Sequence, residues 1–264
     1  MKHNLEKWGK TDLDGIVVLG SNGEFVYLTE AEKLEVIQFA VNNFTKAKKI
    51  IAGVSCESTA ETIETAKKAA ALGVDAVLVL PPHYYRGAMK DEILYGYFTD
   101  VADSSPVPVM LYNMPGNTGI NLSSALIARL SNHPNIAGVK DTGGNIVQLA
   151  ETVRDTDDNF SVFAGNTGYL MPALAVGARG AASSGQHIAA GMLRLVKLVR
   201  ENRYEEAKAL QLKLLKINTL VTGKYGFRPQ SGYGHAGLRG RFPRKPLKPA
   251  SEEARGKSRL NLKR

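Results

Sequence analysis

A lysine at the end of an apolar run is the residue of this chain best suited to chemistry. Residues 136–139 form a short apolar run typical of a buried strand, Lys140 follows it, and a polar, glycine-rich turn begins at Asp141. Lysine is rarely buried unless it is paired, so Lys140 either extends its amine to solvent or is held there for a reaction. The residues at the ends of the other strands bear on this choice.

Polar side chains also follow the other apolar runs of the sequence. The carboxyl ends of parallel strands face the active site in an α/β barrel, so such residues would converge on one rim around Lys140. In chain order, these polar groups are residues 20–24, 56–58, 83–86, 112–113, 140–142, 166–167 and 183–184.

This set suits a lysine that acts as a nucleophile toward a carbonyl. Burial disfavours the charged ammonium, and the neutral amine can form a Schiff base with a 2-oxo acid. The protonated imine draws electrons from an adjacent carbon–carbon bond, which can then break or form without a metal or another cofactor. Tyr112 ends the neighbouring strand, where its hydroxyl could relay protons. The alternative is a half-buried strand tyrosine whose hydroxyl is hydrogen-bonded.

The alternation of apolar runs with helical segments predicts the fold. The runs are residues 15–20, 49–55, 76–82, 107–115, 136–140, 160–166 and 180–185, and the helical segments include 89–102, 122–130, 146–153, 170–176 and 192–200. Thr29 with Glu32 and Ser58 with Glu61 are typical of capping boxes. Buried strands alternating with helices predict a (β/α)8 TIM barrel that lacks its first strand, which we expect before Met1. An open, doubly wound sheet is the alternative.

The positive charge of the chain is concentrated in its last part. The formal net charge is +9, and residues 223–264 carry 12 Lys and Arg but only two Glu, which leaves −1 for residues 1–222. We therefore predict a barrel over residues 1–187, C-terminal helices over 188–222 and an irregular, basic tail rich in Gly, Arg and Pro over 223–264. An alternative function is an inactive, truncated barrel whose tail binds an anionic partner such as nucleic acid.

Composition narrows the remaining classes of protein. No apolar run approaches the roughly 18 residues that a membrane span needs. The acidic and basic N-terminus does not resemble a targeting peptide, and a single cysteine, Cys56, fits a reducing compartment, so we expect a cytoplasmic protein. The five histidines have no ligand spacing, so we expect no metal site.

Three segments of the sequence resemble one family. Residues 20–24 (GSNGE), 112–119 (YNMPGNTG) and 138–144 (GVKDTGG) are similar to motifs of the N-acetylneuraminate lyase / dihydrodipicolinate synthase family of class I aldolases. The resemblance extends from about residue 12 to residue 226, and the motifs occur in the order and at the spacing of the family. It implies a (β/α)8 barrel enzyme, a lyase that uses pyruvate and no cofactor.

The resemblance also implies roles for individual residues. Lys140 matches the Schiff-base lysine, Tyr112 the tyrosine that relays protons, and Tyr84 a tyrosine that reaches into the site of a partner subunit, with Tyr85 as the other possible register. The implied substrate-binding residues are Ser21 and Asn22 for the carboxylate of the keto acid, Thr142 beside the lysine, Asn117, and Ala182 through its backbone carbonyl.

Asn117 distinguishes branches of this family. Dihydrodipicolinate synthases place an arginine there to hold the carboxylate of the second substrate, and an asparagine cannot make that bidentate contact. The chain is more similar to the 4-hydroxy-2-oxoglutarate aldolase branch, which implies cleavage of a 4-hydroxy-2-oxo acid to pyruvate and an aldehyde. Dihydrodipicolinate synthase or another pyruvate-dependent activity is the alternative. The family also implies a homodimer or homotetramer that acts on a small 2-oxo acid. From the composition we expect no membrane partner, and nucleic acid is the less favoured partner.

Overall fold

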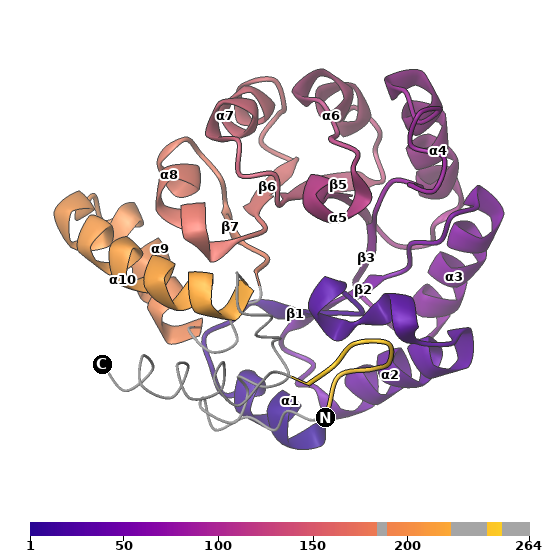
Figure 1. The fold of residues 1–264 in the computed structure, drawn as a ribbon, viewed down its shortest axis with the longest axis horizontal. Coiled ribbons are helices and arrows are strands. Elements are labelled where there is room, and N and C mark those ends of the chain that lie inside the picture. The colour runs from indigo at the N-terminus through magenta and orange to yellow at the C-terminus, as the bar shows by residue number, and fades with distance from the viewer. Residues whose placement is uncertain (184–188, 223–241, 250–264) are drawn as a thin grey trace.

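A curled, parallel sheet of seven strands forms the centre of the protein, and helices cover its outer side (Figure 1). The computed structural model describes residues 1–183, 189–222 and 242–249. The strands are β1 (Gly15–Val18), β2 (Lys49–Gly53), β3 (Ala76–Val79), β4 (Val109–Asn113), β5 (Ile136–Asp141), β6 (Ser161–Ala164) and β7 (Gly180–Ala181). Each strand pairs in parallel with the next one along the chain.

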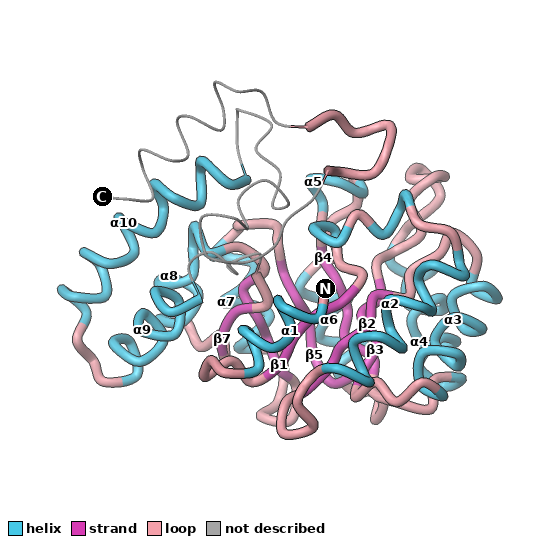
Figure 2. The backbone as a smooth tube through the Cα atoms, turned by 90° about the horizontal axis from the view of Figure 1, so that it is seen from below, coloured by secondary structure: helices cyan, strands magenta, loops and turns pink. Residues whose placement is uncertain are grey.

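Helices connect successive strands and pack on the outside of the sheet (Figures 1 and 2). They are α1 (Lys2–Gly9), α2 (Glu30–Asn43), α3 (Thr59–Ala71), α4 (Asp91–Ser104), α5 (Pro115–Thr118), α6 (Ser124–Ser131), α7 (Ile146–Arg154), α8 (Leu170–Ala175), α9 (Ala189–Arg200) and α10 (Tyr204–Thr222). Figure 2 shows α5 at the end of β4, away from the helices that flank the sheet. The short 3-10 turns η1 (Ser21–Gly23), η2 (Phe25–Tyr27) and η3 (Thr167–Tyr169) follow β1 and β6.

The seven predicted strands are confirmed, and the strand order excludes the doubly wound alternative. A doubly wound sheet reverses its strand order at a switch point, whereas this sheet runs from β1 to β7 without a crossover. Most strands end earlier than predicted, because the polar residues after them form turns. The predicted end of the last strand at Gly185 lies outside the described residues. The eighth strand before Met1, the division at residues 187 and 222 and the character of the tail stay predictions.

One of the two predicted capping boxes is complete. At the start of α2, the Thr29 hydroxyl accepts from the Glu32 N–H and the Glu32 carboxylate accepts from the Thr29 N–H. At the start of α3, the Ser58 hydroxyl accepts from the Glu61 N–H at 3.1 Å, without the reciprocal bond. The prediction of a full box at Ser58 is therefore wrong, although the residue does cap the helix.

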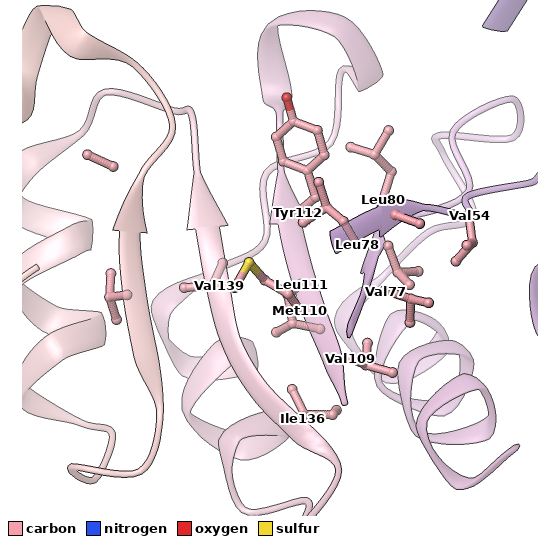
Figure 3. Packing of buried hydrophobic residues seen from close by; sticks show 14 of the residues in the cluster. Val54, Val77, Leu78, Leu80, Val109, Met110, Leu111, Tyr112, Ile136 and Val139 are labelled. Carbon is pink, nitrogen blue, oxygen red and sulfur yellow. The ribbon is translucent and has the colours of Figure 1, made fainter. Parts of the chain in front are cut away.

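Apolar side chains are buried on both faces of the strands, as expected for a parallel sheet. The outer face packs against the helices, and the inner face packs within the curled sheet. All five residues of β4 are buried, and so are Val77 in β3 and Val139 in β5. Figure 3 shows Tyr112 at the end of this apolar layer, with its hydroxyl directed away from Met110 and Leu111. The core thus fixes the ring of Tyr112 and leaves its hydroxyl toward the carboxyl ends of the strands.

The pairing of β4 with β5 aligns the two predicted catalytic residues. The register shifts by one residue after Val109, and beyond this irregularity Tyr112 lies opposite Lys140. On the other side of β5, Gly138 faces β6 so closely that a Cβ there would lie 2.3 Å from the carbonyl oxygen of Ser161. A side chain at this position cannot be accommodated without moving the strand that carries Lys140.

We predict that Gly138→Ala lowers the free energy of unfolding by about 1–3 kcal/mol, because the added methyl group meets backbone. Urea unfolding measures this loss. The matched control is Gly96→Ala on α4, where an added Cβ has no neighbour within 4 Å. That change should stabilise the helix by about 0.5–1 kcal/mol. Equal stability of Gly138→Ala and the unmodified protein would contradict the close packing of β5 on β6.

Candidate active site

Lys140 and Tyr112 form the centre of the site. Lys140 is 6% exposed and Tyr112 3% exposed, and Nζ of Lys140 lies 4.3 Å from the centroid of the Tyr112 ring. Attraction between an amine cation and a ring of this kind strengthens when both are shielded from water. Burial decides between the two interpretations of Lys140: its side chain does not extend to solvent.

The turn after β1 reaches the hydroxyl end of Tyr112. Ser21, in η1, has its Oγ 3.3 Å from the Tyr112 hydroxyl oxygen. Asn22 is half-buried in the same turn. Two predicted elements of the site, the Ser21-Asn22 pair and the tyrosine, are therefore brought together from strands that are not neighbours in the sheet.

Glu24 anchors this turn to the C-terminal part of the chain. Glu24 has a left-handed backbone (φ 57°) and is 8% exposed, and its Oε2 accepts a hydrogen bond of 2.7 Å from the Arg244 N–H. The Arg244 guanidinium also pairs with Glu32, the capping residue of α2. In Figure 1 segment 242–249, in yellow, lies beside α2. It connects the turn that carries Ser21 with the helix that follows it.

A buried polar network fixes the backbone after Lys140. Oδ2 of Asp141 accepts from Nδ2 of Asn113 at 2.7 Å, and Oδ1 accepts from the Gly143 N–H at 2.9 Å. Burial raises the pKa of the Asp141 carboxyl, and the hydrogen bonds from Asn113 and from the turn partly offset this effect. Asn113 is itself held by the Leu122 N–H, which donates to its Oδ1 at 3.0 Å. The turn after Lys140 is thus tied to β4.

Tyr169, in the η3 turn that follows β6, supports the same segment. Its hydroxyl donates to the carbonyl oxygen of Asp141 at 2.6 Å. Burial raises the pKa of the Tyr169 phenol, and the negative charge of Asp141 adds to the rise, so the hydroxyl stays a donor at neutral pH. The residue after Lys140 is held through both its side chain and its carbonyl.

Thr142, two residues after Lys140, has a buried hydroxyl. Its Oγ1 is shielded from solvent and has no hydrogen-bond partner among the residues that the structure describes. A Cβ at Gly165 would lie 2.2 Å from this oxygen, so the hydroxyl fits only beside a glycine. A buried hydroxyl without a partner costs about 1–3 kcal/mol, which a ligand group can recover.

Three further predicted residues lie on other elements. Tyr84 is 77% exposed and forms an edge-on pair with the exposed Tyr85, at 5.0 Å between ring centroids. Asn117 is exposed on α5. Ala182 follows β7 and donates its N–H to the Ala164 carbonyl at 3.0 Å. The structure thus brings Lys140, Tyr112 and Ser21 together, and the role of every predicted site residue stays a prediction.

The sequence did not predict several supporting residues. Tyr169, Gly165 and Arg244 act through contacts between distant parts of the chain. Asn113 and Asp141 were among the polar groups expected at the strand ends, and the structure adds the hydrogen bond between them. No comparable signal marks Tyr169 or Arg244.

Neither a metal-binding cluster nor a membrane span is found in the described parts of the chain. Residues 1–183, 189–222 and 242–249 contain no group of three His, Cys, Asp or Glu side chains placed to bind a metal ion. Over the same ranges, no helix combines the length and the apolar character needed to cross a bilayer.

A buried lysine beside a tyrosine, at the carboxyl ends of a curled parallel sheet, is the arrangement that a lyase working through a Schiff base needs. The comparisons agree, because a family model described as the Dihydrodipicolinate synthetase family matches residues 2–264. The chain belongs to this family of pyruvate-dependent class I aldolases and related lyases. The family resemblance of the three sequence motifs is confirmed.

The individual relatives carry two kinds of name. The 4-hydroxy-tetrahydrodipicolinate synthase of Oceanobacillus iheyensis is 35% identical over 218 residues, which cover 82% of this chain and 73% of that protein. The probable mitochondrial 4-hydroxy-2-oxoglutarate aldolase of Emericella nidulans is 37% identical over 258 residues, or 93% of this chain and 82% of that protein.

Solved structures share the whole fold. The crystal structure of a dihydrodipicolinate synthase from Bacillus anthracis superposes with a TM-score of 0.93 at 30% identity, covering 99% of this chain and 90% of that one. A prophage protein of the same family from Escherichia coli, in complex with pyruvate, gives a TM-score of 0.92 at 27% identity, with 99% and 90% covered.

We predict that Tyr169→Phe slows formation of a pyruvate Schiff base about tenfold, because the Asp141 carbonyl loses its donor and the segment after Lys140 loosens. Stability should fall by about 1 kcal/mol, the typical loss for one hydrogen bond. Borohydride trapping at timed intervals and thermal unfolding measure the two effects. Tyr204→Phe removes an exposed hydrogen bond to Asn202 and should change neither. Unaltered trapping in Tyr169→Phe would show that this contact has no part in positioning Lys140.

Proposed function

We propose that this protein cleaves a 4-hydroxy-2-oxo acid to pyruvate and an aldehyde, with 4-hydroxy-2-oxoglutarate as the representative substrate. The observation that carries the proposal is the buried amine of Lys140, aligned in register with Tyr112, whose hydroxyl meets Ser21. Asn117 in place of an arginine, and the aldolase relative that matches 93% of the chain, favour this substrate class over dihydrodipicolinate synthesis.

The first step joins the substrate to Lys140. The neutral amine attacks the C2 carbonyl to give a carbinolamine, which takes up a proton from solvent as it loses water and becomes a protonated imine. Ser21 and Asn22 are proposed to hold the C1 carboxylate through the hydroxyl and the N–H groups of the η1 turn. The Thr142 hydroxyl is proposed as a further donor, since a ligand would satisfy an oxygen that is otherwise buried without a partner. The Ala182 carbonyl is the proposed acceptor facing the bound pyruvate.

The second step breaks the C3–C4 bond. The Tyr112 hydroxyl relays the proton of the C4 hydroxyl, while the electron pair of the C3–C4 bond moves into the imine and leaves an enamine. The aldehyde departs, the enamine takes a proton at C3, and water releases pyruvate and restores the amine. The Ser21–Tyr112 contact provides the path by which this proton can leave and return.

We also propose that the protein forms a homo-oligomer. Tyr84 and Tyr85 form an exposed aromatic pair, and two hydrogen bonds of 2.9 Å from the His83 and Tyr84 N–H groups to Glu57 hold its loop. Exposed aromatic side chains are enriched where subunits meet. We propose that Tyr84 contacts the site of a second copy in a homodimer or homotetramer. The predicted cytoplasmic location stays a prediction.

The alternatives rest on other observations. Dihydrodipicolinate synthase activity is favoured by the names of relatives such as the one from Oceanobacillus iheyensis. The inactive barrel with an anion-binding tail rests on residues 223–264, most of which lie outside the described residues.

We predict that borohydride traps pyruvate on Lys140 and that Lys140→Ala abolishes the adduct, because the amine is the nucleophile. Intact mass and peptide mapping identify the modified residue. Lys49→Ala is the matched control, since Lys49 also lies in a strand of the sheet but is exposed and paired with Asp75 at 2.7 Å. This control should be trapped as the unmodified protein is. An unmodified protein whose mass does not change would remove the basis of the proposal.

We predict that Tyr112→Phe lowers kcat for pyruvate release from 4-hydroxy-2-oxoglutarate by about 10²–10⁴-fold, the usual contribution of a proton-transfer group. Trapping of pyruvate should persist, because Lys140 is retained. A coupled assay for pyruvate measures the rate. Condensation of pyruvate with a second aldehyde substrate, without cleavage of any 4-hydroxy-2-oxo acid, would instead support dihydrodipicolinate synthesis.

A further inference from the structure

Arg86 lies on the loop between β3 and α4, and its side chain contacts the end of α5. A Cβ at Gly119 would lie 2.8 Å from Nη1 of Arg86 and 2.9 Å from its Cδ. Gly119 ends α5 with a left-handed backbone (φ 69°). The guanidinium therefore occupies the space that the missing side chain of Gly119 leaves open, and any other residue at position 119 would displace it.

The short helix α5 connects Arg86 with the catalytic lysine. It follows β4, which carries Tyr112, and Pro115 at its start packs on the turn after Lys140, with 3.6 Å between its Cγ and a Cβ placed at Gly143. Four residues of helix are about 6 Å long. An extended five-carbon dicarboxylate, with carbon–carbon bonds of about 1.5 Å, spans roughly 5 Å. Arg86 and the turn after Lys140 thus contact opposite ends of one short helix, whose length is close to that of such a substrate.

The guanidinium of Arg86 has no partner of opposite charge in the described part of the chain. Neighbouring rim groups have partners: His83 pairs with Glu57 at 3.0 Å, and Glu24 accepts from the Arg244 N–H. Arg86, by contrast, is exposed, and its guanidinium has neither an ion pair nor a hydrogen bond to residues 1–183, 189–222 or 242–249. An arginine held in place by packing, with its donors free, is suited to bidentate binding of a carboxylate.

We propose that Arg86 binds the distal carboxylate of a dicarboxylic 4-hydroxy-2-oxo acid and thereby selects it over substrates with an uncharged end. Arg86 would supply, from the neighbouring loop, the charge that Asn117 lacks on α5. This inference rests on the proposed aldolase function and adds a determinant of substrate specificity. It assigns Arg86 no part in the chemical step, which belongs to Lys140 and Tyr112.

Arg86→Gln tests the assignment with two substrates. We expect KM for 4-hydroxy-2-oxoglutarate to rise at least tenfold with kcat nearly unchanged, because a charged contact present in both the ground and transition states is lost. KM for 4-hydroxy-2-oxopentanoate, which has a methyl group in place of the distal carboxylate, should not change. Arg86→Lys should restore part of the loss, since it keeps the charge but not the planar fork.

Two further variants serve as a control and as an independent test of the position of Arg86. Lys90→Gln removes another exposed cation of the same loop and should leave both substrates unaffected. Gly119→Ala should raise KM for the dicarboxylate in the same direction as Arg86→Gln, because the methyl group displaces the guanidinium.

The outcomes separate the two proposals. If the unmodified protein traps pyruvate and cleaves the dicarboxylate, but Arg86→Gln leaves the ratio of kcat/KM between the two substrates unchanged, Arg86 is not the determinant and the aldolase function stands. An unmodified protein that prefers the methyl substrate also overturns the assignment. If the unmodified protein neither traps pyruvate nor cleaves either acid, both proposals fall.

Discussion

The burial of one amine beside one aromatic ring is the constraint on which the rest of the site depends. Lys140 and Tyr112 are placed opposite each other by the pairing of β4 with β5. Taking a lysine out of water is costly, so the surrounding structure has to hold its strand rigidly. Gly138 permits close packing against β6, and Asp141 and Tyr169 fix the backbone just beyond the lysine. The catalytic geometry is therefore a property of three neighbouring strands.

The polar groups around this amine are arranged on two levels. The Ser21 hydroxyl contacts the Tyr112 hydroxyl, and the Thr142 hydroxyl is buried without a partner among the described residues. Around them, the side chains of Asn113 and Glu24 are hydrogen-bonded within the chain. The buried carboxylates are therefore compensated, whereas one buried hydroxyl is left without a partner among the described residues. The carboxylates of Asp141 and Glu24 are therefore assigned to holding the backbone around the site, and they are not candidates for acid–base catalysis.

Much of the fold was predictable from local pattern. The seven apolar runs and the Thr29–Glu32 box are short-range signals, and the structure confirms them. Lys140 could be singled out because a lysine closing a buried strand is rarely buried itself, and because its motif resembles that of the family. Its association with Tyr112 needed the strand order. The contact of Tyr169 with the Asp141 carbonyl and that of Arg244 with Glu24 could not be predicted, because such contacts depend on how distant segments pack. At Ser58, the Glu61 side chain does not accept a hydrogen bond from the Ser58 N–H. A sequence motif therefore does not by itself fix the geometry of its side chains.

The hydrogen bond from Arg244 to Glu24 joins residues that are 220 positions apart in the chain. During synthesis, the group that anchors the turn of Ser21 emerges more than 200 residues after the turn itself. Contacts of such long sequence separation form late, because a long loop has to close before they can stabilise anything. The strands can pair in order as they are made, whereas the turn that carries Ser21 gains this support only after β7 has been made. The position of Ser21 beside Tyr112 is thus coupled to a segment that follows all seven strands of the described sheet.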